Sequence, residues 1–219
     1  ACYEAADYIA IGSDVVKKSM IDRCVPEEKL FLNTYGVDLS MFIPADYNVE
    51  KKYDVIYAGT WSKQKGSDLF SQVIQQLPDL KFAHVGTIGD VPIPKLPNFE
   101  HVDPVDQTEL PRFYQASRTF LHTSRQDGFS MVLSQAMACN LPIVASYASG
   151  ASNLKKMVDY PEYVQVYDSP TIEDLCAGIR KAIQQQKELT FHYGGTAVEN
   201  LSWEAYGKRY ADFLLKITG

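Results

Sequence analysis

The sequence predicts an α/β fold built on a doubly wound, parallel, six-stranded sheet. From residue 53 onward, short apolar runs alternate with segments of helical periodicity, and the loops after the runs are short. Strands that alternate with helices give parallel sheets with right-handed crossovers, which favours the strand order 3-2-1-4-5-6. A composition of 46% hydrophobic and 22% charged residues over 219 residues fits one compact domain with additional segments.

The first 45 residues are predicted to stand apart from this sheet, as the end of one domain followed by a hinge. Ser13 can cap a helix whose apolar residues are Val16, Met20 and Cys24. Turn-forming residues then separate short apolar runs, and a proline begins a linker. In order, we expect a short strand at 7–12, this helix, an apolar run at 30–32, a turn at 35–38 and a linker at 44–48.

A regular alternation begins after Lys52, and it contains six apolar runs that we interpret as the strands. They are expected at 53–58, 80–85, 99–102, 119–123, 141–145 and 163–167. The connection between the second and third strands contains a proline-rich loop at 92–97, so we expect no helix there.

Helices are expected between the other strands and at the end of the chain. The first presents one apolar face, made of Leu69, Phe70, Val73, Ile74 and Leu77. Further helices are expected at 106–116, 129–139, 151–158 and 171–187, followed by a long amphipathic helix at 202–217. Asp106 with Glu109, and Thr171 with Asp174, have the spacing of a capping box.

The stretch 125–140 is the best candidate for a ligand site, because it runs from a strand end through a glycine turn into an apolar helix. Free N–H groups of residues 129–132 at such a helix start attract anions. Asp127 stands at this opening, and Gln135 follows a little over two helical turns later, so both side chains can point toward it. The alternative is that Asp127 is only the cap of a buried helix.

The predicted strand order brings a second loop to the same place. In a doubly wound sheet, ligands bind outside the carboxyl ends of the strands at the topological switch, here strands one and four. The loop after strand one is 59–66, so its Lys65 should face the helix start at 129 and form a diphosphate clamp. A solvated loop lysine is the alternative. No G-x-G-x-x-G follows strand one, which argues against a nicotinamide or flavin site.

Composition and spacing exclude several other classes of function. The net charge of −6, without a basic run, argues against nucleic-acid binding. No apolar run approaches the roughly 18 residues of a membrane span and no signal peptide opens the chain, so we expect a cytoplasmic protein. The four cysteines lack metal or redox spacing and favour buried free thiols. No metal site is expected, and packing or surface roles are assigned to His84, His101, His122 and His192.

With these residues, the chain resembles the carboxy-terminal, donor-binding half of GT-B glycosyltransferases, in particular the large retaining family 4. That family includes many sugar transferases of polysaccharide and lipopolysaccharide assembly. The family's hinge signature is similar to residues 35–38 of this chain, together with Phe42 and Pro44. The family's first nucleotide loop is similar to residues 57–59, together with Lys65-Gly66. The family's central motif is similar to residues 127–139 followed by 141–145. The start of the family's terminal helix is similar to residues 202–204.

The resemblance covers nearly the whole chain and implies its organisation. Residues 1–45 are expected to be a remnant of an amino-terminal acceptor domain with the hinge, 46–200 a Rossmann-like nucleotide-sugar-binding domain, and 201–219 a terminal crossing helix. The implied activity is retaining transfer of a sugar from a nucleotide diphosphate sugar to a saccharide or lipid-linked acceptor. The acceptor would be held by the missing domain, so we expect the fragment to be inactive alone. No cofactor is expected, and the full enzyme is compatible with peripheral membrane association.

The resemblance also implies roles for individual residues. Lys65 and Asp127 are the expected catalytic residues, and Gln135 is expected to bind the ribose. The expected donor-binding set is Gly59, Thr60, Lys65, Arg125, Asp127, Gly128, Phe129, Ser130, Met131, Val132 and Gln135. The backbone expected to bind the base is that of Val102, Asp103, Pro104 and Val105.

Three positions depart from the family's pattern and leave a second function open. The family has two glutamates with seven residues between them, where this chain has Asp127 and Gln135. Thr60 replaces an arginine that shares the diphosphate with the lysine, unless Arg125 takes that place. The alternative is therefore a degenerate, non-catalytic nucleotide-sugar-binding or assembly module. An epimerase or phosphorylase of related architecture is disfavoured, because no cofactor lysine constellation is evident.

Overall fold

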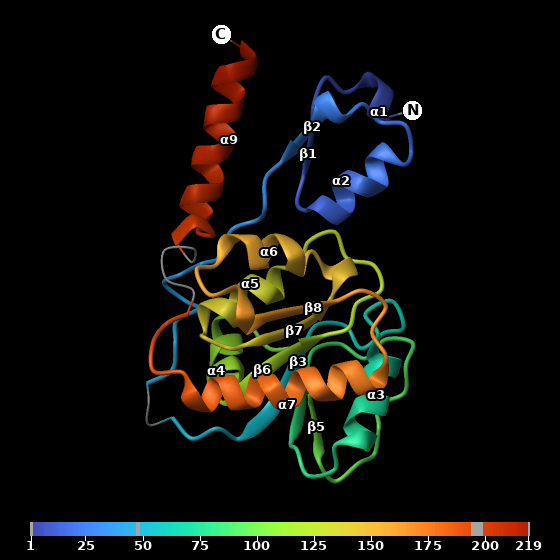
Figure 1. Cartoon of the computed structure of the whole chain (residues 1–219), viewed down its shortest axis with the longest axis vertical. Coiled ribbons are helices and arrows are strands. Elements are labelled where there is room, and N and C mark those ends of the chain that lie inside the picture. Colours follow the sequence, from blue (N-terminus) through green and yellow to red (C-terminus); the bar gives the residue numbers. More distant parts are fainter. Residues whose placement is uncertain (1, 47–48, 194–198, 219) are drawn as a thin grey trace.

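The computed structural model describes residues 2–46, 49–193 and 199–218 of the chain. Its centre is a parallel six-stranded sheet with the order β5-β4-β3-β6-β7-β8, and helices cover both faces (Figure 1). Counted along the sequence, this order is 3-2-1-4-5-6. The predicted fold class and strand order are therefore confirmed.

Each predicted strand is present, with ends that differ from the expected ones by no more than two residues. The strands are β3 (Tyr53–Ala58), β4 (Phe82–Val85), β5 (Phe99–Val102), β6 (Ser117–His122), β7 (Ile143–Ser146) and β8 (Val164–Tyr167). The seventh strand begins after Pro142, which has no N–H to donate to the ladder, while its carbonyl still accepts from the N–H of Phe120 at 3.0 Å.

The helices of this domain also match the prediction in number and place. They are α3 (Ser67–Gln76), α4 (Leu110–Gln115), α5 (Met131–Ala138), α6 (Ala151–Met157) and α7 (Ile172–Glu188). Helix α7 packs against α3 on one face of the sheet, and α5 packs against α6 on the other (Figure 1). Short 3₁₀ turns occur at Glu27–Lys29, Gln107–Glu109, Tyr147–Ser149 and Pro161–Tyr163.

One of the two predicted capping boxes forms. At the start of α7, the Thr171 side chain accepts from the N–H of Asp174 at 3.1 Å, and Asp174 accepts from the N–H of Thr171 at 3.0 Å. The prediction for Asp106 is wrong, because its side chain makes no cap hydrogen bond. A 3₁₀ turn begins there instead, and the N–H of Glu109 bonds the backbone carbonyl of Asp106 at 2.9 Å.

The core is densest around the two central strands. Val55 and Ile56 of β3, and Phe120 and Leu121 of β6, are fully buried. Parallel strands covered on both faces need continuous rather than alternating apolar runs, which explains why these strands were readable from the sequence. Among the described cysteines, Cys139 is buried, whereas Cys176 is half-buried and Cys24 is exposed, so the expectation of buried thiols holds for Cys139 alone.

The amino-terminal segment forms a separate two-stranded parallel sheet. Its elements are α1 (Cys2–Ala5), β1 (Ile9–Ile11), α2 (Asp14–Ile21) and β2 (Leu30–Leu32). The chain's last helix, α9 (Trp203–Thr218), joins this segment, and both lie on the same side of the large sheet (Figure 1). The ring of Phe213 in α9 stacks on Phe31 of β2, with centroids 4.0 Å apart. Assignment of residues 1–45 to the remnant of another domain stays a prediction.

The turn predicted at residues 35–38 begins only at Asp38, whose carbonyl accepts from the N–H of Phe42 at 2.9 Å, and residues 35–37 form no turn. Val37 forms a parallel bridge with Ser202, and its N–H bonds the carbonyl of Leu201 at 2.7 Å. Gly36 lies so close to the backbone of Trp203 that a Cβ at this position would be 2.6 Å from the Trp203 Cα. The glycine is therefore needed for close approach of two chain segments and not for a turn. No helix within the described ranges is long and apolar enough to cross a membrane.

Candidate functional site

The loops after β3 and β6 meet at the carboxyl edge of the sheet. The N–H of Arg125 donates to the carbonyl of Gln64 at 2.9 Å, and the hydroxyl of Thr123 donates to the carbonyl of Gly66 at 3.0 Å. The side-chain amide of Gln64 also donates to the carbonyl of Gln126 at 3.2 Å. The prediction that the two loops lie together at the topological switch is confirmed.

Two glycines allow this close approach. Gly66 has a φ of 74°, and a Cβ there would lie 2.1 Å from the carbonyl oxygen of Thr123. Gly86, after β4, has a φ of 146°, and its Cβ would lie 2.1 Å from the carbonyl oxygen of Gly59. Both positions combine a backbone conformation that favours glycine with an approach that excludes any side chain.

Tyr57, Trp61 and His84 form a buried aromatic cluster that holds the backbone of the loop after β3. Trp61 is fully buried, and its indole N–H donates to the carbonyl of Pro92 at 3.3 Å. The hydroxyl of Tyr57 donates to the carbonyl of Thr60 at 2.9 Å, and Nε2 of His84 donates to the carbonyl of Gly59 at 2.7 Å. Burial lowers the pKa of His84 to about 4, so its ring is neutral at pH 7. The backbone of the loop is therefore held in place before any ligand binds.

Lys65, Asp127 and His122 lie together next to this cluster. The Nζ atom of Lys65 lies 2.5 Å from Oδ2 of Asp127, and Nε2 of His122 lies 3.4 Å from the same oxygen. The Asp127 side chain is 15% exposed and that of His122 is 1% exposed. Burial raises the pKa of Asp127, but hydrogen bonds from His122 and Lys65 outweigh it and lower this pKa to about 2. The carboxylate is thus ionised and fixed by two donors.

The stability of the protein at acid pH should report these contacts. Because the folded-state pKa of Asp127 is lowered, its contribution is fully present above about pH 4 and is lost as the pH falls through 2. We expect it to be about 2 kcal/mol of unfolding free energy. Asp127→Asn should therefore flatten the pH dependence between pH 4 and 2, measured by urea unfolding. The exposed Asp103→Asn is the control and should keep the wild-type slope, and an unchanged slope in Asp127→Asn would contradict the assignment.

Helix α5 begins at Met131, four residues after Asp127 and two residues later than predicted. Ser130 is its N-cap, and the N–H of Ser130 is already bonded to the carbonyl of Ser149 at 3.1 Å. The prediction of free N–H groups is therefore wrong for Ser130. Those of Phe129, Met131 and Val132 have no hydrogen-bond partner within the part of the chain that the structure describes. Three donors at a helix start remain available to an anion.

The amino-terminal segment covers the turn that precedes α5. The hydroxyl of Ser13, which caps α2, donates to the carbonyl of Gly128. A Cβ at Gly128 would lie 3.2 Å from the Val16 side chain. The small size of Gly128 thus serves packing between two segments, and the ring of Phe129 lies edge-on to that of Tyr35.

The structure does not bring Arg125 or Gln135 to Lys65. Arg125 forms a bidentate ion pair with Asp68, at 2.6 and 2.8 Å, and also donates to the carbonyl of Lys63. The Gln135 side chain is buried, and its oxygen accepts from the hydroxyl of Tyr114 at 3.3 Å. Each of these side chains already has a protein partner, so a role in donor binding stays a prediction for both.

The residues expected at the base lie at the carboxyl end of the edge strand. Val102 ends β5, and its carbonyl accepts from the N–H of Gly86 at 3.1 Å. Asp103 follows with an exposed side chain, and its carboxylate lies 3.5 Å from Nε2 of His101. The loop thus sits on the same edge as Lys65, beyond β4, and its contact with a base stays a prediction.

His122 is the residue of this group that the sequence analysis missed. The sequence predicts a packing or surface role for it, but its ring nitrogen contacts Asp127. Its position was a usable signal, since a polar titratable residue ends an otherwise apolar strand five residues before the proposed ligand residue. No group of three side chains suited to a metal ion occurs within residues 2–46, 49–193 and 199–218.

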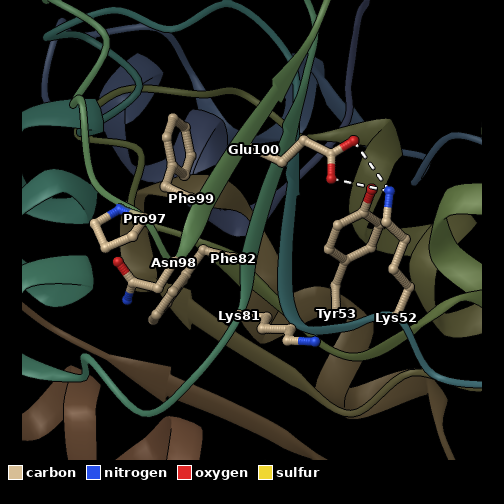
Figure 2. Close-up of a pocket in the computed structure, with 8 residues that line it drawn as sticks. All are labelled: Lys52, Tyr53, Lys81, Phe82, Pro97, Asn98, Phe99 and Glu100. Atoms are coloured by element: carbon tan, nitrogen blue, oxygen red, sulfur yellow. Dashed lines mark hydrogen bonds and ion pairs between the residues drawn. The ribbon is translucent and has the colours of Figure 1, made fainter.

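A separate hollow of about 390 Å³ lies at the amino ends of β3, β4 and β5 (Figure 2). Its wall carries the Lys52–Glu100 ion pair, with oxygen–nitrogen distances of 2.9 and 3.1 Å, next to the Tyr53 ring. Because it is at the opposite edge of the sheet from Lys65, it does not belong to the site at the topological switch.

Known proteins share this architecture. The family of glycosyl transferases group 1 matches residues 52–198 of the chain. One component of the human phosphatidylinositol N-acetylglucosaminyltransferase is 26% identical over 172 residues, which cover 71% of this chain and 34% of the human protein.

Two solved structures show the same fold. Sucrose-phosphate synthase from Thermosynechococcus elongatus has a TM-score of 0.77 and 20% identity, over 98% of this chain and 59% of the synthase. The Anabaena protein HepE, solved in complex with UDP-glucose, has a TM-score of 0.76 and 16% identity, over 96% of this chain and 64% of HepE. The chain therefore spans about a third of its human relative and less than two thirds of each solved protein.

Proposed function

Because the chain belongs to the glycosyl transferases group 1, we propose that it is the donor-binding part of an enzyme that transfers a sugar from a nucleotide diphosphate sugar. The observation behind this proposal is that Lys65, at the junction of β3 and β6, contacts Asp127, which lies four residues before Met131, the first residue of α5. One cation, with three N–H groups that have no partner among the described residues, suits a diphosphate, which has several oxygens to be contacted. The complex of HepE with UDP-glucose supports the same class of ligand.

In the proposed reaction, the bond between the anomeric carbon of the sugar and the diphosphate oxygen breaks, an acceptor hydroxyl oxygen bonds that carbon, and the hydroxyl proton passes to the departing diphosphate, on which negative charge develops. Lys65 and the N–H groups of Met131 and Val132 would stabilise that charge from fixed positions. We propose that Lys65 turns to the diphosphate from the oxygen of Asp127 that it contacts in the free protein. Asp127 would then accept hydrogen bonds from the sugar hydroxyls and hold the sugar in one orientation. Retention of configuration is part of this proposal.

The acceptor would be held by segments outside this chain. A second surface must place the acceptor against the donor, since transfer depends on the orientation of the two reactants. The chain covers 34% of the human relative, which is a component of a phosphatidylinositol N-acetylglucosaminyltransferase. We therefore propose a saccharide or lipid-linked acceptor, a cytoplasmic donor pool and no acceptor transfer by this chain alone.

A titration tests the proposal. We expect the chain to bind UDP or GDP at least tenfold more tightly than the matching nucleoside in calorimetry, because the diphosphate adds charged hydrogen bonds. UDP-glucose, UDP-N-acetylglucosamine and GDP-mannose complete the panel and identify the donor class. Binding of none of these ligands, or equal binding of nucleoside and nucleoside diphosphate, would contradict the proposal.

A non-catalytic nucleotide-sugar-binding module is the second candidate. The bond from Tyr114 to Gln135 favours it, because the one polar side chain expected at the ribose already has a partner. Hydrolysis separates the two candidates, since an active donor site should release free sugar slowly when water replaces the acceptor. A chain that binds a nucleotide sugar tightly but releases no sugar over days, even when joined to an acceptor domain, would be the module.

A further inference from the structure

His122 occupies a rigid and almost fully buried position beneath Asp127. Its side chain is 1% exposed, and its ring stacks on Phe120, with centroids 6.0 Å apart and planes at 19°. The ring of Tyr57 lies 5.8 Å from it on the neighbouring strand. A ring in contact with two aromatic neighbours has little freedom to turn, so the direction of its nitrogens is set by the fold.

The contacts of the ring define its protonation. Nε2 faces Oδ2 of Asp127 at 3.4 Å, whereas the buried Nδ1 has no hydrogen-bond partner within the part of the chain described. An ionised carboxylate only accepts hydrogen bonds, so the proton must be on Nε2. A second proton on Nδ1 would bury an unpaired donor, and burial accordingly lowers the pKa of His122. The ring is therefore the neutral Nε2–H tautomer.

Asp127 shares one oxygen between two donors of different kinds. Lys65 at 2.5 Å is a flexible cation on the loop after β3, and His122 is a fixed neutral donor at the end of β6. When Lys65 moves to a diphosphate, the mostly buried carboxylate keeps only the His122 contact among its described partners. A buried carboxylate without any donor is strongly disfavoured, so this contact decides whether Asp127 stays ionised and in place.

We propose that His122 is the positioning residue that holds Asp127 toward the donor sugar while Lys65 binds the diphosphate. The inference rests on the proposed function and assigns recognition of the sugar, as distinct from the diphosphate, to the His122–Asp127 pair. With a bare nucleoside diphosphate, water fills the sugar position and can solvate Asp127. With a nucleotide sugar, the carboxylate is enclosed and depends on His122. Removal of the imidazole donor should therefore affect the two ligands unequally.

Three substitutions separate this role from a structural one. The amide nitrogen of His122→Gln can reach the place of Nε2, whereas that of His122→Asn can reach only the place of Nδ1. His122→Phe keeps a stacked ring without any donor. We expect the Asn and Phe variants to lose about tenfold in affinity for the nucleotide sugar and less than twofold for the nucleoside diphosphate. The Gln variant should stay within about threefold of wild type for both ligands.

Calorimetry with UDP, UDP-glucose, GDP and GDP-mannose measures these changes, and thermal unfolding checks that each variant folds. Equal losses for the sugar and bare diphosphate ligands, or no rescue by Gln, would overturn the positioning role while the proposed function stands. If the wild-type chain binds none of the four ligands, the proposed function fails and this inference fails with it. If the Phe variant does not fold, the comparison of Gln with Asn decides.

Nuclear magnetic resonance of the imidazole nitrogens gives a readout that does not depend on ligand binding. Long-range proton–nitrogen correlations should show His122 with a protonated Nε2 and a bare Nδ1 at pH 7. Asp127→Asn should shift the Nε2 resonance, because the carboxylate that accepts its proton is replaced by an amide. A His122 ring protonated on Nδ1 alone would overturn the proposal, since Nε2 could then donate nothing to Asp127.

Discussion

Replacement of Lys65 by alanine should weaken the binding of a nucleoside diphosphate by about 10- to 100-fold, and that of the nucleoside by less than twofold. In the free protein the lysine contacts Asp127, shortly before the start of α5, and we propose that in the complex it contacts only phosphate oxygens of the ligand. Loss of a charged hydrogen bond costs about 1.5 to 3 kcal/mol, which gives this range. Calorimetry with UDP against uridine, and with GDP against guanosine, measures both effects.

Lys63→Ala is the matched control for this variant. Lys63 lies in the same loop and is exposed, so its replacement removes the same charge and leaves the loop otherwise unchanged. It should lower nucleoside diphosphate affinity by less than threefold, because it weakens only the long-range electrostatic attraction between the protein and the ligand. Comparable losses in the two variants would show that the binding depends on loop charge and not on the place of Lys65. A comparable loss for the nucleoside would indicate damage to the fold.

Trp61→Ala should lower the unfolding free energy by about 3 to 5 kcal/mol, more than any other substitution proposed for this protein. The indole is fully buried, lies 5.5 Å from the ring of Phe70 and 4.9 Å from that of His84, and bonds the carbonyl of Pro92. Its removal leaves a cavity under the loop after β3 that the rigid strands cannot close. Urea unfolding followed by circular dichroism measures the loss.

The second tryptophan of the chain provides the control. Trp203 is 44% exposed at the start of α9, so Trp203→Ala should cost less than about 1.5 kcal/mol. Trp61→Ala should also weaken nucleoside diphosphate binding, since the loop that carries Lys65 loses its support. A cost for Trp61→Ala no larger than that for Trp203→Ala would contradict the assignment of Trp61 to the core that holds the site.

The sequence was sufficient for the architecture because the signals for it are local. Apolar runs such as 55–58 end at glycines or loop residues, and a strand covered on both faces is apolar along most of its length. Because crossovers between parallel strands are right-handed, few strand orders are possible for six alternating strands. The order chosen places β3 beside β6, so the loops that follow these strands were expected to meet. The Thr171–Asp174 box was also predictable, because both partners lie within one helical turn.

The details of the site depend on contacts between distant parts of the chain, and these were not predictable from spacing. The N–H of Ser130 donates to the carbonyl of Ser149, which lies in the segment after β7. Arg125 is held by Asp68, and Gln135 by Tyr114, through rotamers that no sequence pattern specifies. His122 was misassigned for the same reason, since a buried histidine at a strand end differs from a packing residue only by what its nitrogen meets.

A crystal structure of the chain with the nucleotide sugar that it binds best would show directly whether Lys65 binds the diphosphate and Asp127 the sugar. We predict that the diphosphate lies within hydrogen-bond distance of the Lys65 Nζ and of the N–H groups of Met131 and Val132, with Asp127 turned to the sugar. Lys65 should have left the oxygen that it contacts at 2.5 Å in the free protein, and His122 should have kept it. A nucleotide bound elsewhere, for example in the hollow beside Lys52 and Glu100, with the Lys65–Asp127 pair intact, would contradict the account.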